Sequence, residues 1–269
     1  MKKSLSILFV SLVAMFSSCT EVMEDFDLTT AEPKIVVDAM VSPQKAQVIL
    51  SKTTSYLNPN NVPYISGASF YLSFNDTQLA LNEDSAGYYS ATMNFPEETT
   101  YELHVLIGKE NIRATSYMPK AILWDSVTVQ KSEFADWIPA GLMDSTKTLY
   151  DVLGYMTDIK SVVNYYKLDI WNADTLLSRL VTDDGYFDGQ AIQLVTLMGA
   201  YSSTDTLRLY LSSIDKAAYE FYNTLALSNS SSGMFSAPDN PKSNLEGDAL
   251  GRFYAYSIDS MYVTFSKEE

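Results

Sequence analysis

The chain has little of the chemistry that cysteine, histidine and glycine-rich sites depend on. Cys19 and His104 are the only residues of their types among 269. An intramolecular disulfide and a zinc site built from several Cys or His ligands are therefore excluded. The sequence also contains no Gly-x-Ser-x-Gly elbow and no phosphate-cradling or dinucleotide-binding glycine loop. We interpret His104, on the strand face opposite Leu103 and Val105, as a surface residue, and we expect neither enzymatic activity nor a cofactor.

Basic residues are scarce as well. Lys and Arg together number 18 against 33 Asp and Glu, which gives a formal net charge of −15. Removal of residues 1–18 takes away Lys2 and Lys3 and no acid, so the charge of −15 becomes −17. An acidic surface repels the phosphates of nucleic acids, and we therefore exclude nucleic acid as a partner.

The apolar run that opens the chain is short. Two lysines precede the stretch Leu5–Phe16, and its roughly a dozen residues fall short of the about 20 that a membrane-spanning helix needs. The pattern predicts an export signal peptide over residues 1–18. Ser17-Ser18-Cys19 resembles a lipobox, whose cysteine is acylated (with palmitate, for example) before cleavage. The alternative is an ordinary signal peptide that happens to contain a cysteine.

Residues 19–32 show no apolar periodicity, and we interpret them as a lipidated acidic tether. The acids close to the anchor resemble the surface-export signal of Bacteroidota lipoproteins; they are Glu21, Glu24, Asp25 and Asp27. That resemblance implies a protein held by its lipid in the outer membrane and facing the cell exterior. A simple solvated tether is a compatible alternative.

The apolar alternation within residues 33–119 predicts a succession of short strands. Phe70, Leu72 and Phe74 alternate with mostly polar neighbours, and Leu103 and Val105 share one face of a later strand. Turn residues separate the strands, and helical periodicity is almost absent. This pattern indicates an antiparallel Ig-like β-sandwich.

Residues 120–269 predict a second β-rich domain that carries one α-helix. Within residues 206–211, Leu207, Leu209 and Leu211 point one way, whereas Arg208 and Tyr210 point the other. The fold class is therefore mainly β: one sandwich followed by a β-rich domain. The similar segments 124–129 and 258–263 are interpreted as its first and last strands, either neighbours in one sheet or alike by chance.

The helix is expected near residues 213–227. Ser212 can cap it, with Asp215 three residues on as in a capping box, and Ala217, Phe221 and Leu225 form one apolar stripe. The polar loop 228–244 that follows is long and contains two prolines. It is either an ordered binding or docking loop or a mobile one.

Three further patterns suggest sites. Asp183, Asp184 and Asp188 are weak calcium candidates, because their spacing departs from the EF-hand and the two Asp-Gly pairs suit a β-turn. Six positions follow Asp and precede a small or apolar residue, as in the O-glycosylation acceptors of Bacteroidota exported proteins; they are Ser85, Ser126, Ser145, Thr175, Thr206 and Ser260. Six tyrosines in or beside loops suit sugar stacking or ordinary strand packing; they are Tyr56, Tyr64, Tyr88, Tyr89, Tyr186 and Tyr201.

Several motifs, in order, resemble those of one family. They are the segments 35–40, 65–70, 118–119 with 124–127, 164–166, 182–189 and 240–244 with Gly247. Together they resemble the lipoproteins catalogued as domain of unknown function 4249, widespread in Bacteroidota. Residues 33–119 are also similar to the transthyretin-like sandwich at the front of many outer-membrane transporters, through Ser66-Gly67-Ala68 and Gly87-Tyr88-Tyr89.

The resemblance implies an accessory lipoprotein encoded beside a TonB-dependent outer-membrane transporter, and it carries no catalytic residues. We therefore expect a non-enzymatic accessory or binding subunit of a TonB-dependent transport system, attached to the membrane through its lipid. The alternatives are a free-standing glycan-binding or adhesin lipoprotein that uses loop tyrosines, and a hydrolase whose carboxylates meet only in three dimensions.

Overall fold

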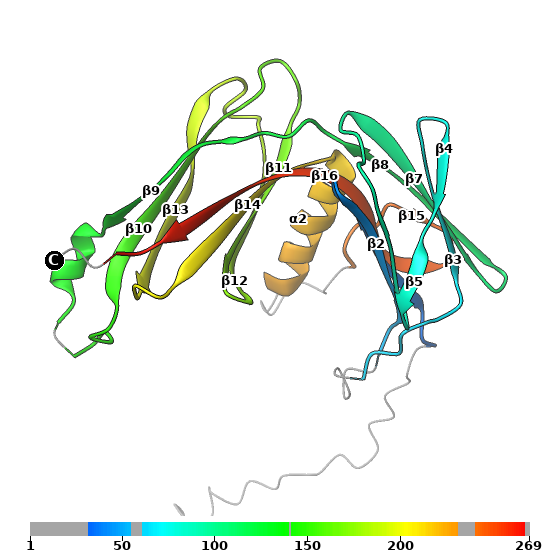
Figure 1. Ribbon diagram of the computed structural model, residues 1–269, viewed down its shortest axis with the longest axis horizontal. Helices are drawn as coiled ribbons and strands as arrows, with labels where there is room; N and C mark the ends of the chain where they lie inside the picture. The colour runs from blue at the N-terminus through cyan, green and yellow to red at the C-terminus, as the bar shows by residue number, and fades with distance from the viewer. Residues whose placement is uncertain (1–31, 55–60, 140, 231–239, 267–269) are drawn as a thin grey trace, which may run out of the picture. The chain divides into compact units, whose positions relative to one another are not determined.

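A computed structural model describes residues 32–54, 61–139, 141–230 and 240–266 (Figure 1). The chain divides into two compact units, residues 1–32 and 33–269, and all described residues except Glu32 belong to the second. The predicted signal peptide, Cys19 and the four acids of the proposed export signal lie outside the described residues. None of the helices that the structure describes is long and apolar enough to span a membrane.

The described chain is mainly β with one α-helix, as the sequence predicts. The first sandwich contains β1 (Ile35–Val41), β2 (Lys45–Lys52), β3 (Ser69–Phe74), β4 (Thr77–Ala80), β5 (Asn82–Ser85), β6 (Tyr88–Thr92), β7 (Thr99–Ile107), β8 (Glu110–Met118) and β15 (Leu245–Glu246). The second contains β9 (Trp124–Lys131), β10 (Thr148–Thr157), β11 (Tyr165–Asn172), β12 (Thr175–Asp183), β13 (Ala191–Tyr201) and β14 (Thr206–Ile214). A short 3-10 helix, η1 (Glu133–Trp137), follows β9, and α2 (Lys216–Ser230) follows β14.

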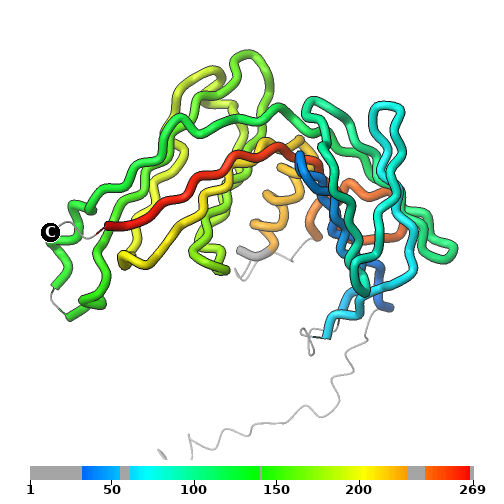
Figure 2. The backbone as a smooth tube through the Cα atoms, in the orientation of Figure 1, coloured from blue at the N-terminus to red at the C-terminus, as the bar shows by residue number. Residues whose placement is uncertain are grey.

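One long strand, β16 (Ala249–Thr264), belongs to both sandwiches. Its first half pairs in parallel with β1, where Val37 lies opposite Gly251, and its second half pairs antiparallel with β14, where Leu211 lies opposite Asp259. Figures 1 and 2 show this strand in orange to red, running from one sandwich into the other. The sheet that results has the order β12-β11-β14-β16-β1-β2-β6-β5. The parallel β1–β16 pair is the exception, among the described strand pairs, to the predicted antiparallel pairing.

On the edge of β16 that faces away from β1, side chains bind the backbone groups of the first half of the strand. The Asn244 amide imitates a neighbouring strand: its Oδ1 accepts from Phe253 N at 3.0 Å and its Nδ2 donates to Phe253 O at 2.7 Å. Ser116 Oγ accepts from Ala255 N at 2.8 Å. Backbone groups that would otherwise be buried without a partner are thereby satisfied.

Each sandwich closes over its own apolar core. In the first, a sheet of order β15-β8-β7-β3-β4 covers the β16-β1-β2-β6-β5 half of the long sheet, and Phe70, Leu72 and Leu103 are buried as predicted. In the second, a sheet of order β13-β10-β9 covers the β12-β11-β14-β16 half. Leu207, Leu209 and Leu211 have no exposed surface there, which confirms their predicted direction.

The two similar segments are the first and last strands of the second sandwich, as interpreted, but they are not neighbours in one sheet. β9 belongs to the three-stranded sheet and β16 to the eight-stranded one. The segments meet across the core instead, where Trp124 N donates to Asp259 Oδ2 at 2.9 Å. Short strands of similar pattern can pack face to face as readily as edge to edge, and periodicity alone does not distinguish these arrangements.

The helix begins three residues later than predicted, and the predicted cap is wrong. Asp215, not Ser212, is the N-cap: its Oδ1 accepts from Ala218 N at 2.8 Å. Its Oδ2 also accepts from Ser116 Oγ at 2.6 Å, so the start of α2 is bound to β8. Burial raises the pKa of the Asp215 carboxyl despite these bonds. Ser212 continues β14, because pairing with β11 extends that strand to Ile214.

Candidate functional site

The predicted acidic cluster forms a turn between β12 and β13. Asp184 and Asp188 come together with Asp158, which the sequence did not suggest, whereas Asp183 lies outside this group. Asp158 Oδ2 accepts from Gly189 N at 2.7 Å, and its other oxygen accepts from the Tyr166 hydroxyl. Asp184 and Asp188 likewise accept from backbone N–H groups, at 2.8 and 2.6 Å. These contacts organise the turn, and three carboxylates alone do not assign a metal.

The predicted tyrosines are spread over the molecule. Tyr89 and Tyr201 are buried in the two cores, where Tyr201 stacks on Phe265 with ring centroids 4.4 Å apart. Tyr64 and Tyr88 are exposed and bonded to each other through their hydroxyls at 2.9 Å. Tyr186 is almost fully exposed, and Tyr56 lies outside the described residues. Loop position therefore did not separate core tyrosines from surface ones.

The other predicted positions lie on strands and turns. Four of the O-glycosylation candidates are exposed and two are half-buried; the exposed ones are Ser85, Ser145, Thr175 and Ser260, and the half-buried ones are Ser126 and Thr206. His104 lies beside Glu102, with Nε2 at 3.0 Å from Oε1. The loop 228–244 has residues 231–239 outside the described residues.

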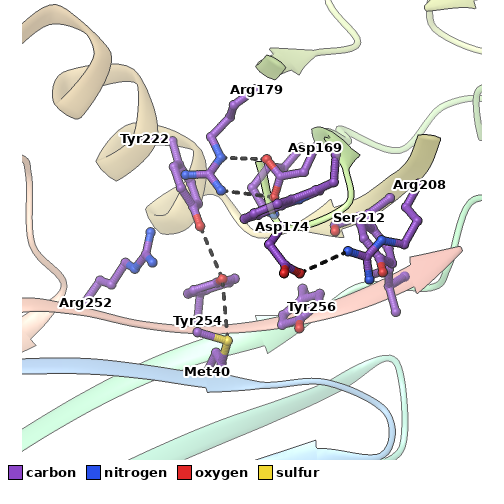
Figure 3. Close-up of a pocket in the computed structure, with 14 residues that line it drawn as sticks. Met40, Asp169, Asp174, Arg179, Arg208, Ser212, Tyr222, Arg252, Tyr254 and Tyr256 are labelled. Atoms are coloured by element: carbon purple, nitrogen blue, oxygen red, sulfur yellow. Dashed lines mark hydrogen bonds and ion pairs between the residues drawn. The ribbon is translucent and has the colours of Figure 1, made fainter. Parts of the chain in front are cut away.

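The most developed site is a cavity of about 520 Å³ on the face of the long sheet that α2 borders (Figure 3). We call it the arginine pocket. Residues of β1, β11, β12, β14, β16 and α2 and one loop residue line it; they are Met40, Lys167, Asp169, Trp171, Asp174, Arg179, Arg208, Tyr210, Ser212, Tyr222, Arg252, Tyr254, Tyr256 and Ile258. Its volume lies within the range of about 300–1,000 Å³ that small-molecule sites occupy.

Three of the four arginines in the chain line this pocket: Arg179, Arg208 and Arg252. Strand alternation puts them there, since the even positions of β14 and β16 face the pocket while Leu209 and Phe253 enter the cores. Lys167 adds a fourth cation from β11. Such a concentration is notable in a chain with a net charge of −15.

One buried carboxylate holds two of these cations. Lys167 Nζ lies 2.6 Å from Asp169 Oδ2, and Arg179 Nε lies 2.6 Å from Asp169 Oδ1. The side chains of Lys167 and Asp169 are only 7% and 8% exposed. Burial raises the pKa of Asp169, but the Arg179 hydrogen bonds and the Lys167 charge outweigh it, so the pKa lies below its ordinary value. Asp169 is therefore a permanent anion at neutral pH.

Arg252 is held by rings as well as by charge. Its Nε donates to Asp38 Oδ1 on β1 at 2.8 Å. The guanidinium carbon lies 4.8 Å from the ring centroid of Tyr222 and 5.0 Å from those of Phe221 and Tyr254. These distances are within the range of cation–π attraction, so the aromatic residues of α2 and β16 fix the position of this cation.

The remaining lining is aromatic, with one unusual hydroxyl. Tyr222 and Tyr254 are buried, and their hydroxyls are hydrogen-bonded at 3.2 Å. The Tyr254 hydroxyl also contacts Met40 Sδ at 3.9 Å (Figure 3). Tyr210 and Tyr256 are half-buried. Ser212 Oγ is fully buried and has no hydrogen-bond partner within the described part of the chain. An unpaired buried hydroxyl is costly in a folded protein.

The charges of the pocket do not balance. Four cations line it, and they face Asp169, Asp174 and, behind Arg252, Asp38. Four positive and three negative groups leave one positive charge in excess. Arg208 contacts the backbone oxygen of Ala173 and lies 3.8 Å from the fully exposed Asp174. An aromatic cavity with excess positive charge in its lining is suited to binding an anion.

Sequence reasoning missed this site because its residues come from distant segments. The only local signal was the outward direction of Arg208 and Tyr210 beside three inward leucines. The scarcity of arginine was a second signal. Of the three pocket arginines only Arg208 lay in a predicted strand, so a search for common motifs does not detect their convergence.

No curated protein matches the chain. The family profile described as Domain of unknown function (DUF4249) matches residues 23–261, which is most of the sequence and includes every residue that lines the arginine pocket. The chain therefore belongs to the DUF4249 family.

Proposed function

We propose that this protein is a non-enzymatic binding subunit that holds a small anionic molecule in the arginine pocket. The observation that carries the proposal is the convergence of Arg179, Arg208 and Arg252, with Lys167, on one aromatic cavity of about 520 Å³. The pocket carboxylates lie beside cations: Asp169 bridges two of them. A carboxylate held in this way is a poor general acid at neutral pH, which favours binding over catalysis.

The cellular part of the proposal rests on the sequence. The lipobox-like Ser17-Ser18-Cys19 and the acidic tether favour a lipoprotein of the outer membrane that faces the cell exterior. The resemblance to accessory lipoproteins encoded beside TonB-dependent transporters favours a role in delivering the bound molecule to such a transporter. The pocket would then hold the cargo, and the sandwiches would supply docking surface.

The test is affinity purification of the tagged, Cys19-acylated protein from native outer membranes in mild detergent, followed by mass spectrometry. A stoichiometric TonB-dependent barrel is the expected result. A parallel purification of Arg208→Gln should recover the same barrel, because Arg208 contacts cargo rather than the transporter in this proposal. Recovery of the lipoprotein without a barrel would overturn the transport role.

A second candidate function is a free-standing glycan-binding or adhesin lipoprotein. The observation that favours it is the exposed Tyr64–Tyr88 pair, whose ring centroids are 5.1 Å apart. Aromatic faces of this kind stack on sugar rings. Glycan-array binding that is lost in Tyr64→Ala and kept in Arg208→Gln would favour this function over the first.

A further inference from the structure

The charge balance of the arginine pocket indicates a ligand with one negative charge. Its four cations face three carboxylates, so a monoanion neutralises the site. A dianion would leave the pocket lining with a net negative charge, which is less favourable than neutrality. The net charge of −15 on the whole chain adds long-range repulsion that grows with the charge of the ligand.

The position of the unpaired hydroxyl indicates what kind of anion fits. Lys167 and Ser212 lie opposite each other in the β11–β14 register, so their side chains are neighbours on the pocket face. An ammonium group has three donors, and Asp169 accepts one from Lys167. Ser212 Oγ has no partner in the described ranges. A carboxylate presents two oxygens, one for each of these donors.

The aromatic lining indicates what carries the carboxylate. The rings of Tyr222 and Tyr254 contact the Arg252 guanidinium, and their hydroxyls are bonded to each other, so both are already engaged within the protein. Tyr210 precedes Ser212 by two residues on the same face of β14, and Tyr256 lies on the adjacent strand; both are half-buried. Half-buried tyrosines beside a carboxylate seat suit a flat or chair-shaped ring.

We propose that the arginine pocket binds a monocarboxylate carried on a six-membered ring, with the carboxylate at Lys167 and Ser212 and the ring against Tyr210 and Tyr256. This inference rests on the proposed binding function and specifies its ligand class. A sugar acid and an aromatic acid share this chemistry, and the experiment distinguishes these two sources.

The experiment is isothermal titration calorimetry on the full mature protein in detergent with three sugars of the same ring size. Glucose is neutral, glucuronate carries one carboxylate, and glucose 6-phosphate carries a near-dianionic phosphate. We expect glucuronate to bind at least about tenfold more tightly than either of the others, which is the factor that one hydrogen bond to a charged group supplies. 4-Hydroxybenzoate is titrated in parallel, and the tighter of the two carboxylates identifies the source.

Variants assign the binding to the pocket. Ser212→Ala should weaken carboxylate binding about fivefold or more without lowering thermal stability, because it removes a hydroxyl that is unpaired in the unliganded protein. Arg208→Gln should weaken binding about tenfold, since this arginine lines the pocket and is one third exposed. Arg113→Gln is the matched control: it removes the remaining arginine, which lies on β8 away from the pocket, and should leave affinity unchanged.

Three outcomes would overturn the inference. One is equal or tighter binding of glucose 6-phosphate or glucose, which would leave the pocket a binding site but refute its ligand class. Another is an equal effect of Arg113→Gln and Arg208→Gln, which would move the binding elsewhere. The third is the absence of binding by both carboxylates at millimolar concentration. Co-purification of a transporter is independent of all three, so the transport role is judged separately.

Discussion

Replacing Asp169 by Asn should destabilise the protein strongly, because it leaves two cations in the pocket wall without their shared anion. Removal of one partner from a buried ion pair costs about 3–5 kcal/mol. Arg179 is 34% exposed and can turn partly toward water, whereas Lys167 is only 7% exposed. We therefore expect a loss of about 3 kcal/mol in the free energy of unfolding, at the lower end of that range.

The measurement is thermal unfolding followed by circular dichroism. For a unit of this size a loss of about 3 kcal/mol corresponds to a decrease in Tm of about 6–12 °C. Asp174→Asn is the matched control, because Asp174 is fully exposed and 3.8 Å from Arg208. An exposed, loosely paired carboxylate contributes little, so this control should leave Tm unchanged.

The difference between wild type and Asp169→Asn should also depend on pH. The pKa of Asp169 is lower in the folded state than in the unfolded state. Its contribution is therefore fully present above the unfolded pKa of about 3.9 and is lost as the pH falls through the folded value. The difference in Tm should be constant from pH 5 to 8 and shrink below pH 4. Equal Tm values at pH 7, or a difference that persists undiminished at low pH, would refute the reasoning.

Three other perturbations have defined outcomes. Gly251→Ala should lower Tm much more than Gly67→Ala. Both glycines have positive φ, but an added Cβ at Gly251 collides with the Val37 carbonyl oxygen, whereas at Gly67 it meets nothing within 4 Å. Similar decreases in Tm would contradict the described β1–β16 contact. Calcium or EDTA should leave Tm unchanged, because the carboxylates of the turn already accept hydrogen bonds from backbone N–H groups. A rise in Tm with calcium that Asp188→Asn abolishes would show a metal site instead. Cys19→Ser should abolish incorporation of labelled palmitate and release the protein from the membrane fraction; retention of the label would place acylation elsewhere.

Most of the fold was accessible from the sequence because local periodicity determines it. Leu207, Leu209 and Leu211 occupy the predicted core face, and the strands around Phe70 and Leu103 are where alternation places them. The helix start was misplaced because Ser212 was interpreted as the cap and Asp215 as its capping-box partner, whereas Asp215 is itself the cap. Tertiary strand pairing, which extends β14 through Ser212, decided between them.

The arginine pocket was not predictable in the same way. Its parts are separated by long stretches of chain, as with Asp38 and Arg252, and only the sheet order brings them together. The acidic cluster shows the same limitation: the Asp-Gly pairs indicate the turn that contains Asp184 and Asp188, but nothing in the local sequence indicates that Asp158 joins them. Chemistry that depends on side chains from several strands requires the register, which alternation alone does not supply.

The strand that both sandwiches share constrains how the protein can mature. The segment before Met118 looks self-sufficient in sequence, yet its sheet remains incomplete until residues 249–255 are in place beside β1. Residues 249–255 are synthesised after β9 to β14, so the first sandwich can close only when those six strands of the second sandwich have already been made. Fragments cut after Met118 should be prone to aggregation, since the edge of β1 would be left unprotected. The shared strand thus makes closure of the first sandwich depend on prior synthesis of most of the second.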